Sequence, residues 1–243
     1  MNQVERIVPE MLKENNLFVN ATKTEKYHVS RHSDNSWKKG KLLGSLFDTE
    51  EDIKRRKGLA IDSLKALKHI FDSRHVSEAV RLRVFKAYIE SIFLYNSVLW
   101  ILTKSLEDKI DSFQRKLLRK VIRVYWPRII SNESLHDRTH MKPWSVVVLK
   151  RRLSWFGHLM RLPPGTPAKQ SLSHFIEPTK RPIGRPKTTW LSTIMNDLKE
   201  HSNLQIHNKL STTLQELENV CSDRKNWTRL INSIMLSKTT NVQ

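Results

Sequence analysis

The sequence has 243 residues, of which 38% are hydrophobic and 28% are charged, and its formal net charge at pH 7 is +19. This length and apolar content allow one large or two modest domains with a core, so the chain is expected to fold. The positive charge is spread along the chain, which favours nucleic acid over a membrane surface as the anionic partner. The single cysteine, Cys221, excludes an intramolecular disulfide and any cysteine-based zinc site.

The hydropathy pattern predicts neither export nor a bilayer span. The N-terminus has no charged-then-apolar secretory pattern. The most hydrophobic run, residues 89–102, is too short to cross a bilayer and carries Glu90 and Asn96. We therefore expect an intracellular protein, in the nucleus or the cytoplasm, that is not secreted.

Scarce glycine and clustered proline predict a mainly α chain with one interruption. Residues 17–29 and 40–47 suggest strands, and four helices follow, each with an apolar face. The first three faces are expected to contain Ile53, Ala60, Leu64, Leu67 and Phe71, then Val84, Tyr88, Ile92, Tyr95 and Leu99, then Leu106, Ile110, Phe113, Leu117 and Val121. The fourth helix runs from Pro143 to about residue 162 and is apolar over most of its circumference, as in a buried helix.

Capping residues predict where these helices begin. Thr49-x-x-Asp52 and Ser105-x-x-Asp108 resemble capping boxes, with Asp in place of the usual Glu. The second helix is expected to start after Ser77. Six of the nine prolines fall between Pro163 and Pro186, which predicts a linker, and residues 190–201 and 210–236 are then predicted as two further helices.

The third helix has the clearest pattern for binding an anion. Lys109, Lys116 and Arg123 recur every seven residues, and Arg119 with Arg115 or Lys120 widens this line opposite the apolar face. Such a helix can pack on its own core while its cations meet a phosphate backbone. The alternative is an ordinary solvated face, but the acidic residues lie only in the first turns and leave the later turns unbalanced.

Three weaker patterns have both a functional and a structural interpretation. The run from Arg151 to Arg161 surrounds Trp155 with cations, so this tryptophan could stack on a base, but its spacing favours a core position. Residues 181–187 resemble an AT-hook without the usual glycine, and a plain basic linker is the simpler interpretation. His136 and His140 have metal-ligand spacing, yet no further ligand lies nearby, so we interpret both as surface residues.

Six short motifs, taken in order, carry a family resemblance over nearly the whole chain. They are Asn20-x-x-Lys23-Thr24-Glu25, Leu43-Gly44-Ser45, Phe113-Gln114-Arg115 with Leu118-Arg119, Arg151-Arg152-Leu153-x-Trp155-x-Gly157-His158-x-x-Arg161, Gly184-Arg185-Pro186-Lys187-x-x-Trp190 and Asp223-Arg224-x-x-Trp227. Their order and spacing resemble the carboxy-terminal part of the reverse transcriptases of LINE-type, non-LTR retrotransposons.

The resemblance implies a role for each region. Lys23 would correspond to the palm lysine near the incoming triphosphate, residues 43–45 to the strand that grips the primer end, and residues 50–125 to the thumb. The region after Trp144 would be the post-polymerase extension. The family's catalytic aspartate pair is absent, because the chain has no two adjacent aspartates. Enzyme activity is therefore uncertain, and the chain alone is predicted to be inactive and to need no cofactor, whereas the complete family polymerase would need Mg²⁺.

The expected architecture is a helical thumb-like bundle with a small β remnant of a polymerase palm and a C-terminal helical module. The expected boundaries are 1–48 for the palm remnant, 49–162 for the bundle and connector, 163–189 for a Pro-rich basic linker, 190–236 for the helical module and 237–243 for a disordered tail. The expected nucleic-acid-binding residues are Lys23, Lys109, Arg115, Lys116, Arg119, Lys120, Arg123, Arg151, Arg152, Arg161, Arg181, Arg185 and Lys187.

The expected function is to grip template–primer or target DNA, with an RNA–DNA hybrid or duplex DNA as the partner and no membrane. The missing polymerase domains are a second candidate partner. The alternatives are a domesticated regulatory nucleic-acid-binding protein and a non-functional pseudogene product.

Overall fold

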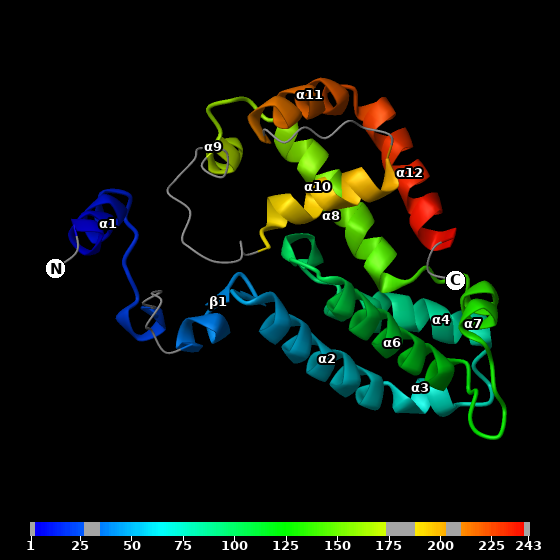
Figure 1. Cartoon of the computed structure of the whole chain (residues 1–243). Coiled ribbons are helices and arrows are strands. Elements are labelled where there is room, and N and C mark those ends of the chain that lie inside the picture. The colour runs from blue at the N-terminus through cyan, green and yellow to red at the C-terminus, as the bar shows by residue number, and fades with distance from the viewer. Residues whose placement is uncertain (1–2, 27–34, 174–187, 203–209, 241–243) are drawn as a thin grey trace. The chain divides into compact units, whose positions relative to one another are not determined.

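The computed structural model describes residues 3–26, 35–173, 188–202 and 210–240 (Figure 1). This part of the chain is mainly helical and contains one two-stranded antiparallel sheet, so the mainly α expectation is confirmed. Contacts between residues divide the chain into two compact units, Met1–Asp52 and Ile53–Gln243. The boundary falls inside helix α2 (Thr49–Ala66). The finer domain boundaries expected from the sequence stay predictions.

The first unit contains short elements. They are α1 (Gln3–Glu14), the 3₁₀ turns η1 (Ala21–Lys23) and η2 (Asn35–Lys39), and the strands β1 (Lys41–Leu42) and β2 (Ser45–Leu46). The two strands form a hairpin that pairs Lys41 with Leu46. The single strand expected at residues 40–47 is therefore only partly right, because Leu43 and Gly44 form the turn with positive φ angles. The strand expected at residues 17–29 is wrong over residues 17–26. There the Asn20 side chain accepts hydrogen bonds from Thr22 N at 3.1 Å and Lys23 N at 3.2 Å, which bends the chain into η1.

The start of α2 differs from its expected capping box by one residue. Asp48, not Thr49, is the capping side chain, because Asp48 Oδ1 accepts hydrogen bonds from Glu50 N at 3.0 Å and Glu51 N at 3.1 Å. Asp52 turns back to the hairpin, where its Oδ1 accepts a hydrogen bond from Leu46 N at 3.1 Å. The acidic cluster therefore fixes a turn and a helix start.

The second unit begins with a bundle of helices around an aromatic core. After α2 come α3 (Lys68–Asp72), α4 (Glu78–Val84), the π-helical turn η3 (Phe85–Glu90), α5 (Ser91–Phe93), η4 (Ser97–Leu99), α6 (Lys104–Val121) and α7 (Asn132–Thr139). In the core, Trp144 stacks on Phe93 at a centroid distance of 4.3 Å and donates its indole N–H to Glu90 Oε2 at 2.9 Å. A fully buried tryptophan is thus satisfied by a buried carboxylate.

The second expected helix starts as predicted but buries a different face. Ser77 Oγ accepts a hydrogen bond from Val80 N, as an N-cap should. Tyr88 and Tyr95 are exposed, however, whereas Phe85, Ile89 and Phe93 are fully buried. The π-helical turn η3 widens the helix over residues 85–90, so the regular 3.6-residue period assumed from the sequence does not apply there.

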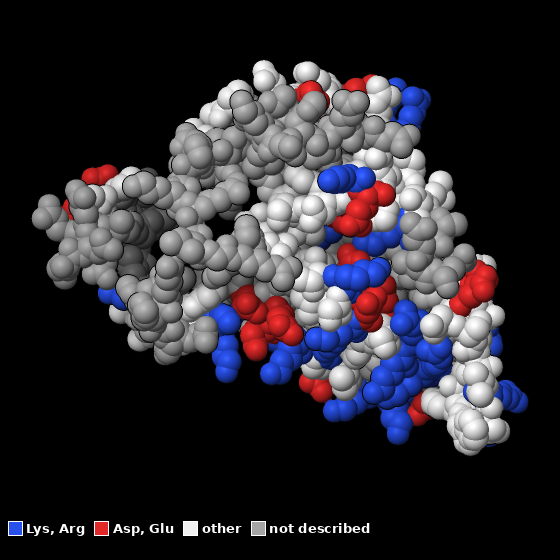
Figure 2. Space-filling view, viewed as in Figure 1, with Lys and Arg blue, Asp and Glu red and all other residues white. Residues whose placement is uncertain are grey.

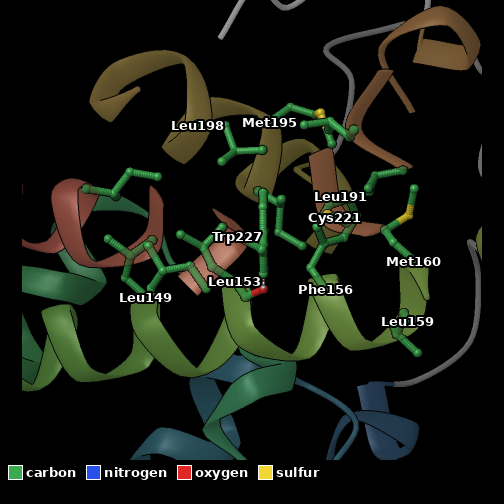
Figure 3. Packing of buried hydrophobic residues seen from close by; sticks show 14 of the residues in the cluster. Leu149, Leu153, Phe156, Leu159, Met160, Leu191, Met195, Leu198, Cys221 and Trp227 are labelled. Carbon is green, nitrogen blue, oxygen red and sulfur yellow. Dashed lines mark hydrogen bonds between the residues drawn. The ribbon is translucent and has the colours of Figure 1, made fainter. Parts of the chain in front are cut away.

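Helix α8 (Trp144–Met160) is shared by this bundle and a second core. Trp144 and Val148 pack into the first core, while Leu149, Leu153 and Phe156 pack into the second. This confirms the expected buried helix that starts at Pro143. The second core is completed by α9 (Pro167–Ser173), α10 (Trp190–His201), α11 (Leu210–Ser222) and α12 (Arg224–Thr240) (Figure 3).

The contact between α8 and α12 requires a glycine. A Cβ atom at Gly157 would lie 2.1 Å from Nε1 of Trp227, which is too close for any side chain. The indole can therefore lie against the α8 backbone and donate its N–H to Leu153 O at 3.0 Å. Figure 3 shows Trp227 between Leu153 and Leu198, where it joins α12 to both α8 and α10.

The C-terminal elements differ from the sequence expectation at three places, although helix α10 has the expected bounds and a true capping box between Thr189 and Ser192. The expected linker contains helix α9, and α12 continues to Thr240, so residues 237–240 of the expected disordered tail are helical and Lys238 is buried. The third difference is a break. The single helix expected over residues 210–236 is two helices. Asp223 interrupts it, because its Oδ1 accepts hydrogen bonds from Lys225 N at 2.7 Å and Asn226 N at 3.3 Å and so starts α12.

Candidate nucleic-acid interface

Helix α6 is held in place by polar contacts on its buried side. Gln114 donates a hydrogen bond to Lys142 O and accepts one from Trp144 N, both at 2.9 Å. Asp111 accepts hydrogen bonds from Ser145 N at 2.8 Å and Ser145 Oγ at 2.6 Å, so a carboxylate of α6 caps the N-terminus of α8. Burial raises the pKa of Asp111, and the two bonds from Ser145 oppose this shift. The orientation of α6, and of its outer face, is therefore fixed by α8.

The outer face of α6 borders a groove. Ser105, Lys109, Ser112, Lys116 and Lys120 follow one another at intervals of three or four residues, so they share one face of the helix. Two depressions lie along this face, of about 620 Å³ and about 400 Å³. Their other walls are Lys57, Leu64 and Lys65 of α2, and Lys68 and Phe71 of α3. We call this surface the α2–α6 groove.

Lysine side chains dominate the wider depression. Lys57, Lys109 and Lys116 line it, with Asp108 as the only carboxylate among its lining residues. Lys57 Nζ lies 3.5 Å from the carbonyl oxygen of Lys109 and 5.4 Å from the centroid of the Phe113 ring. Partial burial, and then the positive charge of Lys109, lower the pKa of Lys57. An anion placed here would offset that repulsion.

The narrower depression lies at the C-terminal end of α6. Lys65, Lys68 and Lys120 line it beside Phe71 and Tyr125. Lys65 and Lys68 have carboxylate neighbours within their own helices, Asp62 at 3.4 Å and Asp72 at 3.9 Å. These pairs are exposed and therefore weak. Figure 2 shows Lys and Arg side chains gathered over α6, α2 and α3.

The structure separates the cations expected on α6 into two groups. Lys109, Lys116 and Lys120 are exposed on the groove face, and Arg115 is half-buried near Asp111. Arg119 instead donates to Ile130 O at 3.3 Å and Asn132 Oδ1 at 2.9 Å, which holds the chain that follows α6. Arg123 lies beyond the end of α6 with a φ of 61°, so the expected line from Lys109 through Arg123 stops at Lys120.

The expected arginines of α8, and Arg161 directly after it, all bind the protein itself. Arg151 donates to Leu94 O at 2.6 Å, and Arg161 donates to Cys221 O at 2.9 Å. Arg152 is fully buried, pairs with Asp197 and donates to Trp100 O at 3.3 Å. Trp155, expected in the core, is 39% exposed and lies against His158, because the core-facing positions of this turn are Leu153 and Phe156.

The remaining expected residues are not gathered at the groove. Lys23 is exposed in η1 of the first unit. Arg181, Arg185 and Lys187 lie outside the described residues. Sequence reasoning missed Lys57, whose place opposite Lys109 depends on how α2 packs against α6. It also missed Arg81. This residue lies four positions before the buried Phe85 and eight before the buried Ile89, so the spacing indicates an arginine on the apolar face of the helix.

Neither a metal site nor a reactive thiol is found in the parts of the chain that the structure describes. No group of three or more His, Cys, Asp or Glu side chains there could hold a metal ion. His136 is half-buried, with Nδ1 2.7 Å from Met141 O, and His140 is exposed at the end of α7. Cys221 is buried, and burial raises the pKa of its thiol to about 12. Across the same residues, every helix falls short of the length and apolar content that a bilayer crossing needs.

One comparison with known proteins bears on origin. A Caenorhabditis elegans protein described as a putative uncharacterized transposon-derived protein is 22% identical over 197 residues, which cover 79% of this chain and 68% of that protein. The chain is thus distantly similar to a transposon-derived protein. No protein-family profile matches the sequence, and no solved structure matches it.

Proposed function

We propose that the chain binds the phosphate backbone of an RNA–DNA hybrid or duplex DNA through the α2–α6 groove. The observation that carries this proposal is the alignment of Lys57, Lys109, Lys116 and Lys120 along one groove while the opposite side of α6 is buried. Eleven residues separate Lys109 from Lys120, which is about 16 Å along a helix. That length matches roughly five nucleotides of one strand.

The origin we propose for this function is the carboxy-terminal part of a retrotransposon reverse transcriptase. The six ordered motifs support it, and so does the distant similarity to a transposon-derived protein. In this role the chain grips template–primer or target DNA and contributes no metal-dependent chemistry, since it has no two adjacent aspartates. A backbone-binding surface of lysines recognises charge and shape, so binding should depend little on base sequence.

The test is to change the four groove lysines Lys57, Lys109, Lys116 and Lys120 together to Gln. Glutamine preserves helix propensity, so folding should be unaffected. Fluorescence anisotropy with a labelled hybrid across a salt series should show weaker binding. If each lysine neutralises one phosphate, the log–log salt slope should become shallower by about 3 to 4 units.

A matched control removes the same charge elsewhere. Lys86, Lys150, Lys199 and Lys225 are exposed on η3, α8, α10 and α12, outside the groove. Changing these four to Gln should lower affinity much less, because long-range attraction alone is screened beyond about 10 Å at 0.1 M salt. Equal losses in the two variants would mean that net charge, not the groove, determines binding.

A further inference from the structure

Three arginines and one glutamate meet beside the C-terminal end of α6. Arg81 and Glu78 lie on α4, Arg123 follows α6, and Arg138 lies on α7. Arg138 donates to both carboxylate oxygens of Glu78, at 2.9 Å and 2.6 Å. Glu78 therefore makes its direct hydrogen bonds with Arg138, and the cluster as a whole has three guanidinium charges for one carboxylate.

The other two arginines have hydrogen-bond donors without acceptors. Arg81 is only 6% exposed, and its buried Nε has no hydrogen-bond partner among the described residues. Arg123 donates from Nε to Phe71 O at 3.0 Å, but its buried Nη2 also has no partner there. A buried cationic donor without an acceptor is costly and uncommon in folded proteins.

Electrostatics and backbone geometry point to the same place. Burial, and then the charge of Arg123, lower the pKa of Arg81, while Glu78 opposes this shift only in part, so the two guanidinium groups repel each other. Arg123 also has a φ of 61°, a left-handed conformation that non-glycine residues seldom adopt. Strained residues of this kind gather at binding sites, where the surrounding structure holds them.

We propose that Arg81 and Arg123 form a site for a phosphate group. A phosphate offers several strong acceptor oxygens to the free donors, and its charge offsets the excess positive charge of three guanidinium groups beside one carboxylate. The site adjoins the α2–α6 groove through Phe71, whose carbonyl accepts the Arg123 bond and which is one of the residues that line the narrower depression. As a nucleic-acid phosphate site it rests on the proposed function, whereas free phosphate binding would not need the groove.

The first experiment titrates the unmodified protein with inorganic phosphate and follows its arginine Nε–H signals by ¹H–¹⁵N spectroscopy, with chloride at equal ionic strength as the control. Arg81→Met assigns the Arg81 signal by its loss. We expect this signal to shift with millimolar phosphate and not with chloride. No phosphate-specific shift would overturn the proposal.

The variants add a stability signature that a structural arginine would not give. Without phosphate, Arg81→Met should raise the melting temperature, because it removes an unpaired buried charge. With phosphate, wild type should gain stability, whereas Arg81→Met should bind phosphate roughly tenfold or more weakly and gain little. Arg83→Met, an exposed change on the same helix, should behave like wild type. An equal gain in Arg81→Met and wild type would also overturn the proposal.

The source of the phosphate is decided with a short oligonucleotide that carries either a 5′-phosphate or a 5′-hydroxyl. A shift of the Arg81 signal with both forms indicates a backbone phosphate, and a shift with the 5′-phosphate alone indicates a strand end. A shift with inorganic phosphate alone indicates a free anion. The groove variant separates the two proposals, because it should lose oligonucleotide affinity and keep the response to inorganic phosphate.

Discussion

Helices α6 and α8 are both rich in cations, but they use them in opposite ways. On α6, Lys109, Lys116 and Lys120 stay on an open groove. On α8, Arg151 and Arg152 donate to backbone carbonyls of the segment between α5 and α6. A planar guanidinium can satisfy carbonyl and carboxylate acceptors inside a protein, whereas a lysine ammonium is strongly hydrated and tends to stay in water. Positive charge in a sequence therefore indicates a nucleic-acid-binding surface only when the arginines that bind the protein itself are left out of the count.

The strongest test of the structural role on α8 is Asp197→Ala. This change leaves the fully buried Arg152 without the carboxylate that pairs with it. Removal of one partner from a buried ion pair typically costs about 3 to 5 kcal/mol. Urea denaturation should show this loss, and the double variant Arg152→Met with Asp197→Leu should recover most of it. A loss below about 1 kcal/mol would contradict a structural role for Arg152.

The second test compares a variant of α8 with the groove variant in both stability and nucleic-acid binding. Arg151→Gln should lower the free energy of unfolding by about 1.5 to 2 kcal/mol, because it removes a charge-assisted bond to Leu94 O. The salt dependence of nucleic-acid binding should stay unchanged. The groove variant should do the reverse and change the salt slope without a loss of stability. An altered slope in folded Arg151→Gln would place α8 in the binding surface.

The third test compares two helical glycines. Gly157→Ala should destabilise by about 1 to 2 kcal/mol, because overpacking against Trp227 outweighs the helix propensity of Ala. Gly58 of α2 has nothing within 4 Å of the position of a Cβ atom. Gly58→Ala should therefore stabilise by about 0.5 to 1 kcal/mol. Thermal unfolding measures both, and equal signs would mean that Trp227 does not lie in close contact with Gly157.

The smallest expected effect is a pH dependence on the buried side of α6. Burial raises the pKa of Asp111 above its ordinary value of 3.8. At pH values between the ordinary and the raised pKa, the folded state therefore binds more protons than the unfolded state. Stability from this group is therefore lost as pH rises through that window. Asp111→Asn should reduce this fall in urea denaturation measured at a series of pH values from 3.8 upward. The control is Asp108→Asn, which removes the same charge from an exposed carboxylate on the same helix.

Local sequence patterns predicted the elements that obey local rules. Helix α10 was predicted with its bounds, and extended structure was predicted at residues 40–47, where β1 and β2 lie, but not the turn between them. Departures came where a side chain replaced a regular backbone bond, as at Asn20 and Asp223, or where the helical period changed, as in η3. Helices α1, α7 and α9 were not predicted.

The candidate site was predicted only in part, for a different physical reason. Lys109, Lys116 and Lys120 could be found from their spacing, because helix geometry alone puts them on one face. The acceptors of Arg151, Arg152 and Arg161 lie 45 to 60 residues away in the chain. No local pattern carries that information. The groove itself depends on the packing of α2 and α3 against α6, which is equally non-local.

One buried contact joins the proposed binding helix to the end of the last helix. Glu107 of α6 accepts a hydrogen bond at 2.8 Å from Lys238 of α12, 131 residues later in the sequence. During synthesis, Glu107 leaves the ribosome long before its partner exists, so α6 stays incomplete until translation reaches residue 238. A premature stop codon that removes only the final turn of α12 would therefore weaken a helix that was translated more than a hundred codons earlier.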